Sequence, residues 1–267
     1  IGNNAGAHGD SATALGNGSS ATNSQSTAIG NNAGAHGDSA TALGNGASAT
    51  NKQATAIGSG AAASGADAIA MGNGSSSTDS STIAIGSGAG AHGDYATALG
   101  SGSSATSSQS TAIGSGAGAH GTYATALGNG AAANTSYDPA IGGSALAGGG
   151  DATALGYNAQ ATAPNATALG SGASAYSHAL ALGNAATASS NYALAAGDGA
   201  NAQSYQAIAL GNSAKSYVTG GIALGSNSKA YRASGTTGLD PRTGKAYTDT
   251  SDKTWNSTYG ALSIGNV

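Results

Sequence analysis

Four histidines lie at equivalent positions and are the side chains best suited to bind a metal ion. His8, His36, His92 and His120 each lie seven residues after an Ile-Gly or Leu-Gly pair that recurs along the chain. If each recurrence adds one strand to a sheet, neighbouring histidines are at least two strands, or ~10 Å, apart. Two of them cannot then bind one ion within a chain. We predict no metal site and interpret the histidines as turn residues, with a site shared between chains as the alternative.

The sequence gives little support for catalysis. Its acidic residues are eleven Asp scattered along the chain, with no Glu, so the carboxylate pair of a carbohydrate-cleaving β-helix has few candidates. Phrases such as "GSGAGAHG" resemble phosphate-binding loops but lack the Gly-Lys-Ser/Thr ending and a following helix. We predict that the protein is not an enzyme, has no catalytic residues and binds no cofactor.

Aromatic and cationic residues are concentrated toward one end of the sequence. There is no Tyr before Tyr95, and six of the seven Lys and Arg residues follow residue 214. Three tyrosines share the repeat position of the histidines, and two lysines lie two residues before two of them. Such side chains on an exposed strand suit contact with a protein. The predicted ligand-binding residues are Tyr176, Lys215, Tyr217, Lys229 and Tyr231; the alternative is ordinary strand filling in a solvated region.

The composition argues against a disordered chain, a nucleic-acid-binding protein and a membrane-spanning helix. The chain has 267 residues with 47 Gly, no Cys, only 7% charged residues and a net charge of −4. Disordered chains are typically richer in charge and in Pro, which occurs three times here. The weakly acidic balance argues against nucleic acid as a partner, and there is no run of ~20 apolar residues to span a bilayer.

A 14-residue repeat runs through the sequence and predicts the fold. Each repeat has an aliphatic residue followed by Gly, which suits a sharp corner, and Thr or an aliphatic residue two positions earlier, which is strand periodicity. Small residues four and six positions later indicate a second strand. Two short strands and two turns form one coil of an all-β, parallel solenoid. The aliphatic positions are Ile1, Leu15, Ile29, Leu43, Ile57, Met71, Ile85, Leu99, Ile113, Leu127, Ile141, Leu155 and Leu169, then, after one 13-residue step, Leu182, Ala196, Leu210 and Leu224.

We expect the two faces of the first strand of each coil to be buried in different surroundings. We expect the Ile/Leu column to point into the coil against the Ala and Ser of the second strand, whose other face points to water. The residue before each Ile or Leu lies on the opposite face and is always Ala, which predicts burial against another copy of the chain. The predicted interface residues are Ala14, Ala28, Ala42, Ala56, Ala84, Ala98, Ala112 and Ala126.

Phrases such as "STAIGNNAGAHG", "ALALGN" and "IALGSNSKA" resemble the YadA-like head repeat of trimeric autotransporter adhesins. The resemblance covers residues 1–230. It implies a left-handed parallel β-roll, three chains side by side, and export to the surface of a Gram-negative bacterium, anchored in the outer membrane by the full-length protein. The repeat period alone fixes neither the handedness nor the number of chains, and a symmetric dimer would also use an Ala face.

The C-terminal residues depart from the period. Residues 231–259 resemble the hairpin inserted in some heads of the family, with a turn at Asp240–Gly244 and Trp255 as a hydrophobic anchor. Residues 260–267 restore the repeat as a last head strand, which in the family leads to a neck, a stalk and a membrane anchor. Because Ile1-Gly2 already falls within a repeat, we expect the sequence to be part of a longer chain.

The resemblance implies a virulence-associated adhesin head. It would attach to host extracellular matrix, to host cells or to sister bacteria through a repetitive trimeric surface. Two alternatives stay open: a β-solenoid that binds an ordered lattice such as ice, and a passive spacer in a surface fibre.

Overall fold

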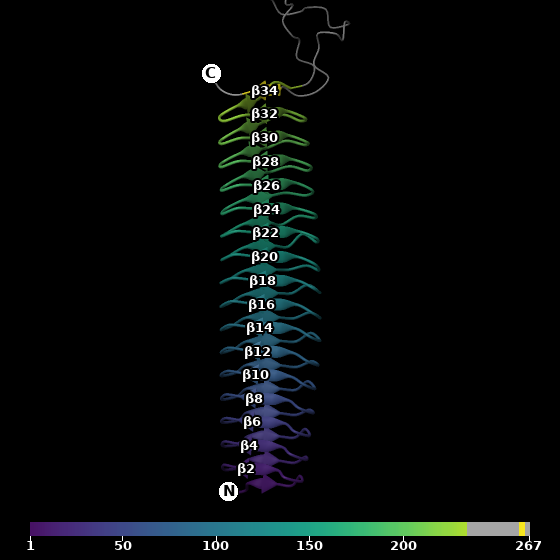
Figure 1. Cartoon of the computed structure of the whole chain (residues 1–267), viewed down its shortest axis with the longest axis vertical. Helices are drawn as coiled ribbons and strands as arrows, with labels where there is room; N and C mark the ends of the chain where they lie inside the picture. Colours follow the sequence, from purple (N-terminus) through teal and green to yellow (C-terminus); the bar gives the residue numbers. More distant parts are fainter. Residues whose placement is uncertain (234–261, 265–267) are drawn as a thin grey trace, which may run out of the picture. The chain divides into compact units, whose positions relative to one another are not determined.

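The computed structural model describes residues 1–233 and 262–264, and every regular element in this part of the chain is a β-strand. It divides into two units, residues 1–144 and 145–267. In each unit a three-residue strand and a two-residue strand alternate along the chain. Strands of one kind stack on the next strand of the same kind (Figure 1). The prediction of an all-β, parallel solenoid with 14-residue coils is confirmed.

The first unit contains β1 to β20. Its short strands are β1 (Gly6–Ala7), β3 (Ser20–Ala21), β5 (Gly34–Ala35), β7 (Ser48–Ala49), β9 (Ala62–Ala63), β11 (Ser76–Ser77), β13 (Gly90–Ala91), β15 (Ser104–Ala105), β17 (Gly118–Ala119) and β19 (Ala132–Ala133). Its long strands are β2 (Thr13–Leu15), β4 (Thr27–Ile29), β6 (Thr41–Leu43), β8 (Thr55–Ile57), β10 (Ile69–Met71), β12 (Ile83–Ile85), β14 (Thr97–Leu99), β16 (Thr111–Ile113), β18 (Thr125–Leu127) and β20 (Pro139–Ile141).

The second unit contains β21 to β34. Its short strands are β21 (Leu146–Ala147), β23 (Gln160–Ala161), β25 (Ser174–Ala175), β27 (Thr187–Ala188), β29 (Asn201–Ala202), β31 (Lys215–Ser216) and β33 (Lys229–Ala230). Its long strands are β22 (Thr153–Leu155), β24 (Thr167–Leu169), β26 (Leu180–Leu182), β28 (Leu194–Ala196), β30 (Ile208–Leu210), β32 (Ile222–Leu224) and β34 (Leu262–Ile264). The predicted hairpin, its turn and Trp255 lie outside the described residues.

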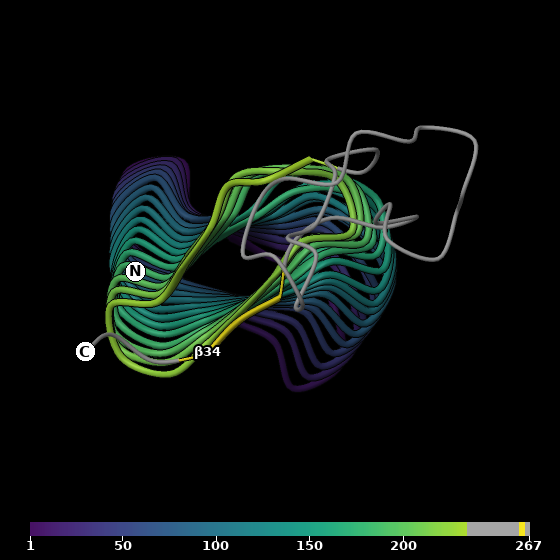
Figure 2. The ribbon, with the colours of Figure 1, turned by 90° about the horizontal axis from the view of Figure 1, so that it is seen from above.

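Neighbouring strands are parallel and keep each residue beside its equivalent in the next coil. Ala98 pairs with Ala112, and Leu99 pairs with Ile113. The 13-residue step is absorbed in a turn, because Ala168 still pairs with Ala181. Seen along the stack, the coils of each unit lie over one another with a gradual rotation (Figure 2). Equivalent side chains therefore form continuous columns that rotate gradually along each unit.

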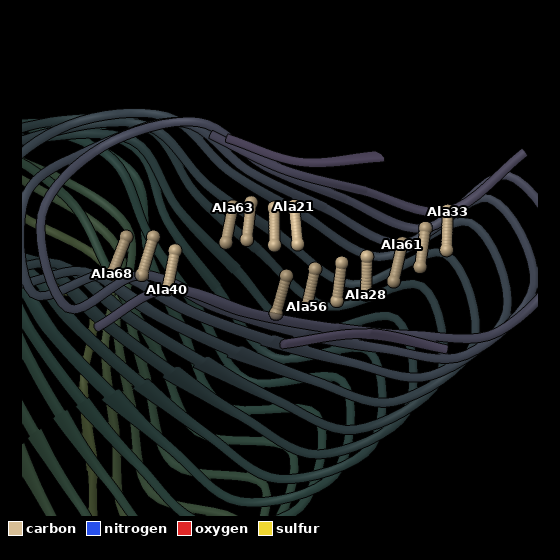
Figure 3. Packing of buried hydrophobic residues seen from close by; sticks show 14 of the residues in the cluster. Ala21, Ala28, Ala33, Ala40, Ala56, Ala61, Ala63 and Ala68 are labelled. Atoms are coloured by element: carbon tan, nitrogen blue, oxygen red, sulfur yellow. The ribbon is translucent and has the colours of Figure 1, made fainter. Parts of the chain in front are cut away.

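The interior of each coil is filled by four small side chains. In one coil these are Ala33 and Ala35, around the short strand β5, and Ala40 and Ala42, around the long strand β6; none is more than 1% exposed. Figure 3 shows rows of such alanines pointing into the coils of the first unit. Because both strands contribute mostly methyl groups, the two sheets lie close together and leave no room for a Leu or Ile side chain between them.

This packing reverses the predicted orientation of the long strands. Leu43 is 42% exposed, whereas its neighbour Ala42 has no exposed surface. The Ile/Leu column therefore points away from the coil and the Ala column fills it. The prediction that these alanines contact another chain is wrong, because their own coils already bury them: Ala14 is 9% exposed, and Ala28, Ala42, Ala56, Ala84, Ala98, Ala112 and Ala126 are 0% exposed.

Among the described residues, the glycine after a long strand forms a corner that admits no side chain. Gly100 has φ +134°, and a Cβ built on it would lie 2.5 Å from the backbone oxygen of Gly114 in the next coil. Its N–H donates to the carbonyl of Ile85 at 2.8 Å. Both the backbone conformation and the closeness of the next coil exclude a larger residue, as the sequence predicts.

Several polar residues in the interior form hydrogen bonds within the adjacent turn. Ser110 replaces the interior Ala and its hydroxyl donates to the carbonyl of Ser107 at 2.6 Å. Asp138 occupies the same column, is fully buried, and its Oδ2 accepts a hydrogen bond from the backbone N–H of Thr135 at 3.1 Å and one from the Thr135 hydroxyl. The interior thus tolerates a polar group that is short enough to reach the turn.

Candidate functional site

The outward face of the long strands in the first unit is an apolar stripe. Each Leu or Met of this column pairs in register with an Ile of the next coil, as Leu43 does with Ile57. A second column, mostly Thr, runs beside it and includes Ile69 and Ile83. After the N-terminal Ile1 at 91%, the most exposed members of the aliphatic column in this unit are Leu15 at 42%, Leu43 at 42%, Met71 at 37%, Leu99 at 39% and Leu127 at 42%.

The second unit has the same stripe, and there the stripe is more apolar than in the first unit. Leu155, Leu182 and Leu224 are 47%, 46% and 42% exposed. From β26 onward the neighbouring column also becomes aliphatic, with Leu180 and then Leu194, Ile208 and Ile222 in place of Thr. We call the outward Ile/Leu/Met column together with its Thr or aliphatic neighbour the apolar stripe. A contiguous exposed stripe of this kind is typical of an association surface.

The short strands present a different surface. In the first unit their outward residues are Gly, Ser or Ala, and the histidines fold back over this face. A Cβ at Gly34 would lie 2.7 Å from Nε2 of His36, so the ring covers the glycine of its own strand. Nδ1 of His36 lies 3.3 Å from the hydroxyl of Thr22 in the preceding coil.

His92 and His120 repeat the same contact. Their Nδ1 atoms lie 3.2 and 3.1 Å from the hydroxyls of Thr78 and Thr106. Among the residues that the structure describes, no three His, Cys, Asp or Glu side chains are grouped to hold a metal ion. These contacts give His36, His92 and His120 a structural role, because each links its coil to the preceding one.

Four of the five predicted ligand-binding residues lie together in the second unit. Lys215 pairs in register with Lys229, and Tyr217 and Tyr231 follow two residues later on the same side of their chains. Lys229 is exposed and Lys215 is half-buried, while Tyr217 and Tyr231 are 39% and 69% exposed. Adjacent strands lie ~4.8 Å apart, so these four side chains form one patch.

The fifth residue, Tyr176, belongs to the same column but lies three coils before Tyr217, with Ser189 and Gln203 between them. It is 53% exposed. The intervening coils carry aromatic residues slightly further along the same turn, at Tyr192 and Tyr205, which the sequence reasoning missed. The prediction from sequence rested only on tyrosines at one repeat position. The signal that could have found Tyr192 and Tyr205 is that every turn of this region contains an aromatic residue, at slightly different positions.

These additional rings contact one another from coil to coil. The ring centroids of His178 and Tyr192 are 5.0 Å apart, and those of Tyr192 and Tyr205 are 5.8 Å apart with an edge-on geometry. Both distances are typical of favourable aromatic pairs. We call Tyr176, His178, Tyr192, Tyr205, Tyr217 and Tyr231, with Lys215 and Lys229, the Tyr–Lys edge.

The geometry defines a class of protein: a β-solenoid with an apolar stripe on one sheet and a polar or aromatic surface on the other. The family model for the YadA head domain repeat matches residues 7–33, 35–61, 63–89, 91–117, 147–173, 177–200 and 202–230. These matches cover more than half of the chain, and the chain belongs to the YadA head repeat family. The search of curated proteins found no match. No helix among the described residues is long and apolar enough to cross a membrane.

Membership of this family gives the chain an adhesin-type, structural role. The family assignment agrees with the resemblance that the repeat phrases indicate. The matched ranges each span about two coils, so the family repeat and the 14-residue structural repeat are in phase.

Proposed function

We propose that the chain is the non-enzymatic head of a bacterial surface adhesin and works as a homotrimer. The apolar stripe carries this proposal. It runs along the described strands of both units and is exposed in a single chain. Its most exposed Leu and Met residues, such as Leu43 at 42%, could bury about a further two fifths of their surface against another copy. Three copies that meet through their stripes would turn their short-strand sheets outward.

The proposed interface lies on the outward Ile/Leu face of the long strands, whereas the sequence predicted it on the Ala face of the same strands. Ala126 is buried in its own coil, and Thr125 and Leu127 on either side of it point outward. The alanine column would still support assembly indirectly, because it sets the thickness of the coil and keeps the stripe continuous from coil to coil.

The adhesive role would come from the outward short-strand sheets. Each coil repeats the same backbone at ~4.8 Å, so a ligand can be contacted many times by one head and again by its two partners. Linking weak contacts in this way raises overall avidity without any new contact. We propose host extracellular matrix, host cells or sister bacteria as partners, and a place on the outer surface of the bacterium, anchored in its outer membrane.

Two measurements test this proposal. Light scattering behind a sizing column should give three chain masses, that is three times 24.6 kDa. Beads coated with the chain should adhere to matrix-coated surfaces or to each other, and uncoated beads should not. A monomer at all concentrations, or coated beads that adhere to nothing, would contradict the proposal.

A lattice-binding solenoid stays as the second candidate because of one observation. The Thr column points outward, as at Thr97 and Thr111 in adjacent coils, which is the direction that a lattice-binding surface needs. Its companion column is Leu and Ile rather than a second Thr. The same face cannot serve both roles, so a monomer with thermal hysteresis would favour this candidate, and a trimer without it would favour the adhesin head.

A further inference from the structure

We propose that the Tyr–Lys edge of the second unit binds an anionic polysaccharide. The inference rests on the proposed function, because it names the ligand class of the adhesin head. It also distinguishes a binding segment from a passive spacer.

The first observation is an aromatic track along one turn. Five successive coils each place an aromatic residue between the short and the long strand: Tyr176 with His178, then Tyr192, Tyr205, Tyr217 and Tyr231. The tyrosines are between 39% and 69% exposed. At ~4.8 Å per coil the track is roughly 20 Å long, which suits an extended polymer lying along the stack.

The second observation is that folding does not require the rings of His178 and Tyr192. Tyr192 has φ +59° and His178 has φ +54°, a backbone region that costs energy for a bulky residue. Equivalent positions in the first unit hold Gln25, Gln53 and Gln109 in some coils and Tyr95, Tyr123 and Tyr137 in others, with nearly the same φ. A turn that folds with Gln has no structural need of an aromatic ring.

The third observation is the pair of lysines beside the track. Lys215 and Lys229 lie opposite each other on adjacent strands, and like charges in this arrangement repel. Neither forms an ion pair with a carboxylate of the described residues. The same outward position is Ser in β3, β7, β11, β15 and β25. The lysine pair is therefore a locally unfavourable departure from the repeat, and such departures are typical of a functional site.

Their chemistry favours an acidic saccharide. A tyrosine ring offers an apolar face and a polar tip, which match the C–H groups and hydroxyls of a sugar ring, and two ammonium groups attract sulfate or carboxylate groups. A single-stranded nucleic acid would require cations along the whole track to match its phosphates, and here the lysines lie at one end. A folded protein partner would need about 800 Å² on this side, whereas the track is one turn wide.

The experiment measures binding of the full chain to immobilised heparin, with neutral dextran and single-stranded DNA as comparison surfaces. The test variants take residues from the chain's own repeats, so that the coils stay folded: Lys215→Ser with Lys229→Ser, and Tyr192→Gln with Tyr217→Thr. The matched controls are Lys52→Ser and Tyr137→Gln, which remove the same groups from the first unit.

We expect heparin binding that weakens as salt rises, and a roughly tenfold or larger loss of affinity in the double lysine variant. The double tyrosine variant should also lose affinity, while both controls bind as the unmodified chain does. No binding to heparin at low salt, equal binding by the lysine variant and the unmodified chain, or DNA binding as tight as heparin binding would each overturn the inference.

Light scattering on the same samples separates the two proposals. A trimer that does not bind heparin would overturn this inference and leave the trimeric head intact. A monomer that binds heparin and loses binding in the lysine variant would overturn the trimer and leave the Tyr–Lys edge as a binding site.

Discussion

Two neighbouring residues of β18 allow the interior and the proposed interface to be tested separately. Ala126 has no exposed surface and Leu127 is 42% exposed, so a lysine at one position enters the coil and a lysine at the other enters the apolar stripe. We predict that Ala126→Lys unfolds the surrounding coils, and that Leu127→Lys leaves each chain folded but separates the trimer.

The magnitudes follow from burial. Full burial of a Leu side chain contributes about 1.5–3 kcal/mol, so the two fifths left exposed at Leu127 correspond to about 1 kcal/mol per chain and about 3 kcal/mol in a trimer. At about 1.4 kcal/mol per tenfold, the association constant should fall at least a hundredfold, and further because three ammonium groups approach one another. Ala126→Lys would bury an unpaired charge, which costs about 3–5 kcal/mol in every chain.

Light scattering over a range of concentrations and circular dichroism on heating measure the two effects. Leu127→Lys should show a lower mass with the β signal retained, and Ala126→Lys should lose part of the β signal at room temperature. A Leu127→Lys protein that keeps the full trimer mass on dilution would refute the proposed interface. An Ala126→Lys protein that melts like the unmodified chain would refute the described interior.

Three further results are expected. Gly100→Ala should lower the melting temperature by several degrees because its Cβ would meet the next coil, whereas Gly102→Ala, whose Cβ would have open space around it, should have a smaller effect; two equal melting curves would contradict this. Asn45 precedes Gly46, whose backbone N–H donates to the backbone carbonyl of Asn31 in the neighbouring coil. Because deamidation of Asn45 requires attack by this nitrogen on the Asn45 side chain, mass spectrometry should show slow deamidation in the folded chain and fast deamidation in urea. Asp138→Ser should melt within a few degrees of the unmodified chain, because Ser110 at the equivalent position donates its hydroxyl to a backbone carbonyl of the turn. A large fall in the melting temperature would show that the carboxylate is required.

The sequence predicted the coil well because the repeat reports backbone constraints directly. A corner that admits no Cβ leaves Gly at every occurrence, as at Gly100, and parallel pairing needs the same spacing in every coil. The same-side placement of Lys215 with Tyr217 also followed from strand periodicity, which is a geometric property of any strand.

The orientation of the long strands was not predictable from period alone. Alternation identifies two faces but does not say which one points inward, and the more apolar face was taken as the core. In this narrow coil the available width, rather than hydrophobicity, decides the question: Ala42 fits between the sheets and Leu43 does not. The informative signal was Ala or Ser on the second strand as well, at Ala33 and Ala35, which implies a core of uniform small residues.

The in-register columns have a consequence for how such a chain could change length. Residues 1–18 and 29–46 are identical in sequence, and each copy begins at the same point of a coil. An unequal exchange between the two gene segments would add or remove 28 residues, which is two whole coils. Every interior alanine, corner glycine and outward leucine would then still meet its equivalent. The fold therefore permits the reach of the protein to vary between generations by about 10 Å a step, with its partner-facing and self-associating surfaces preserved.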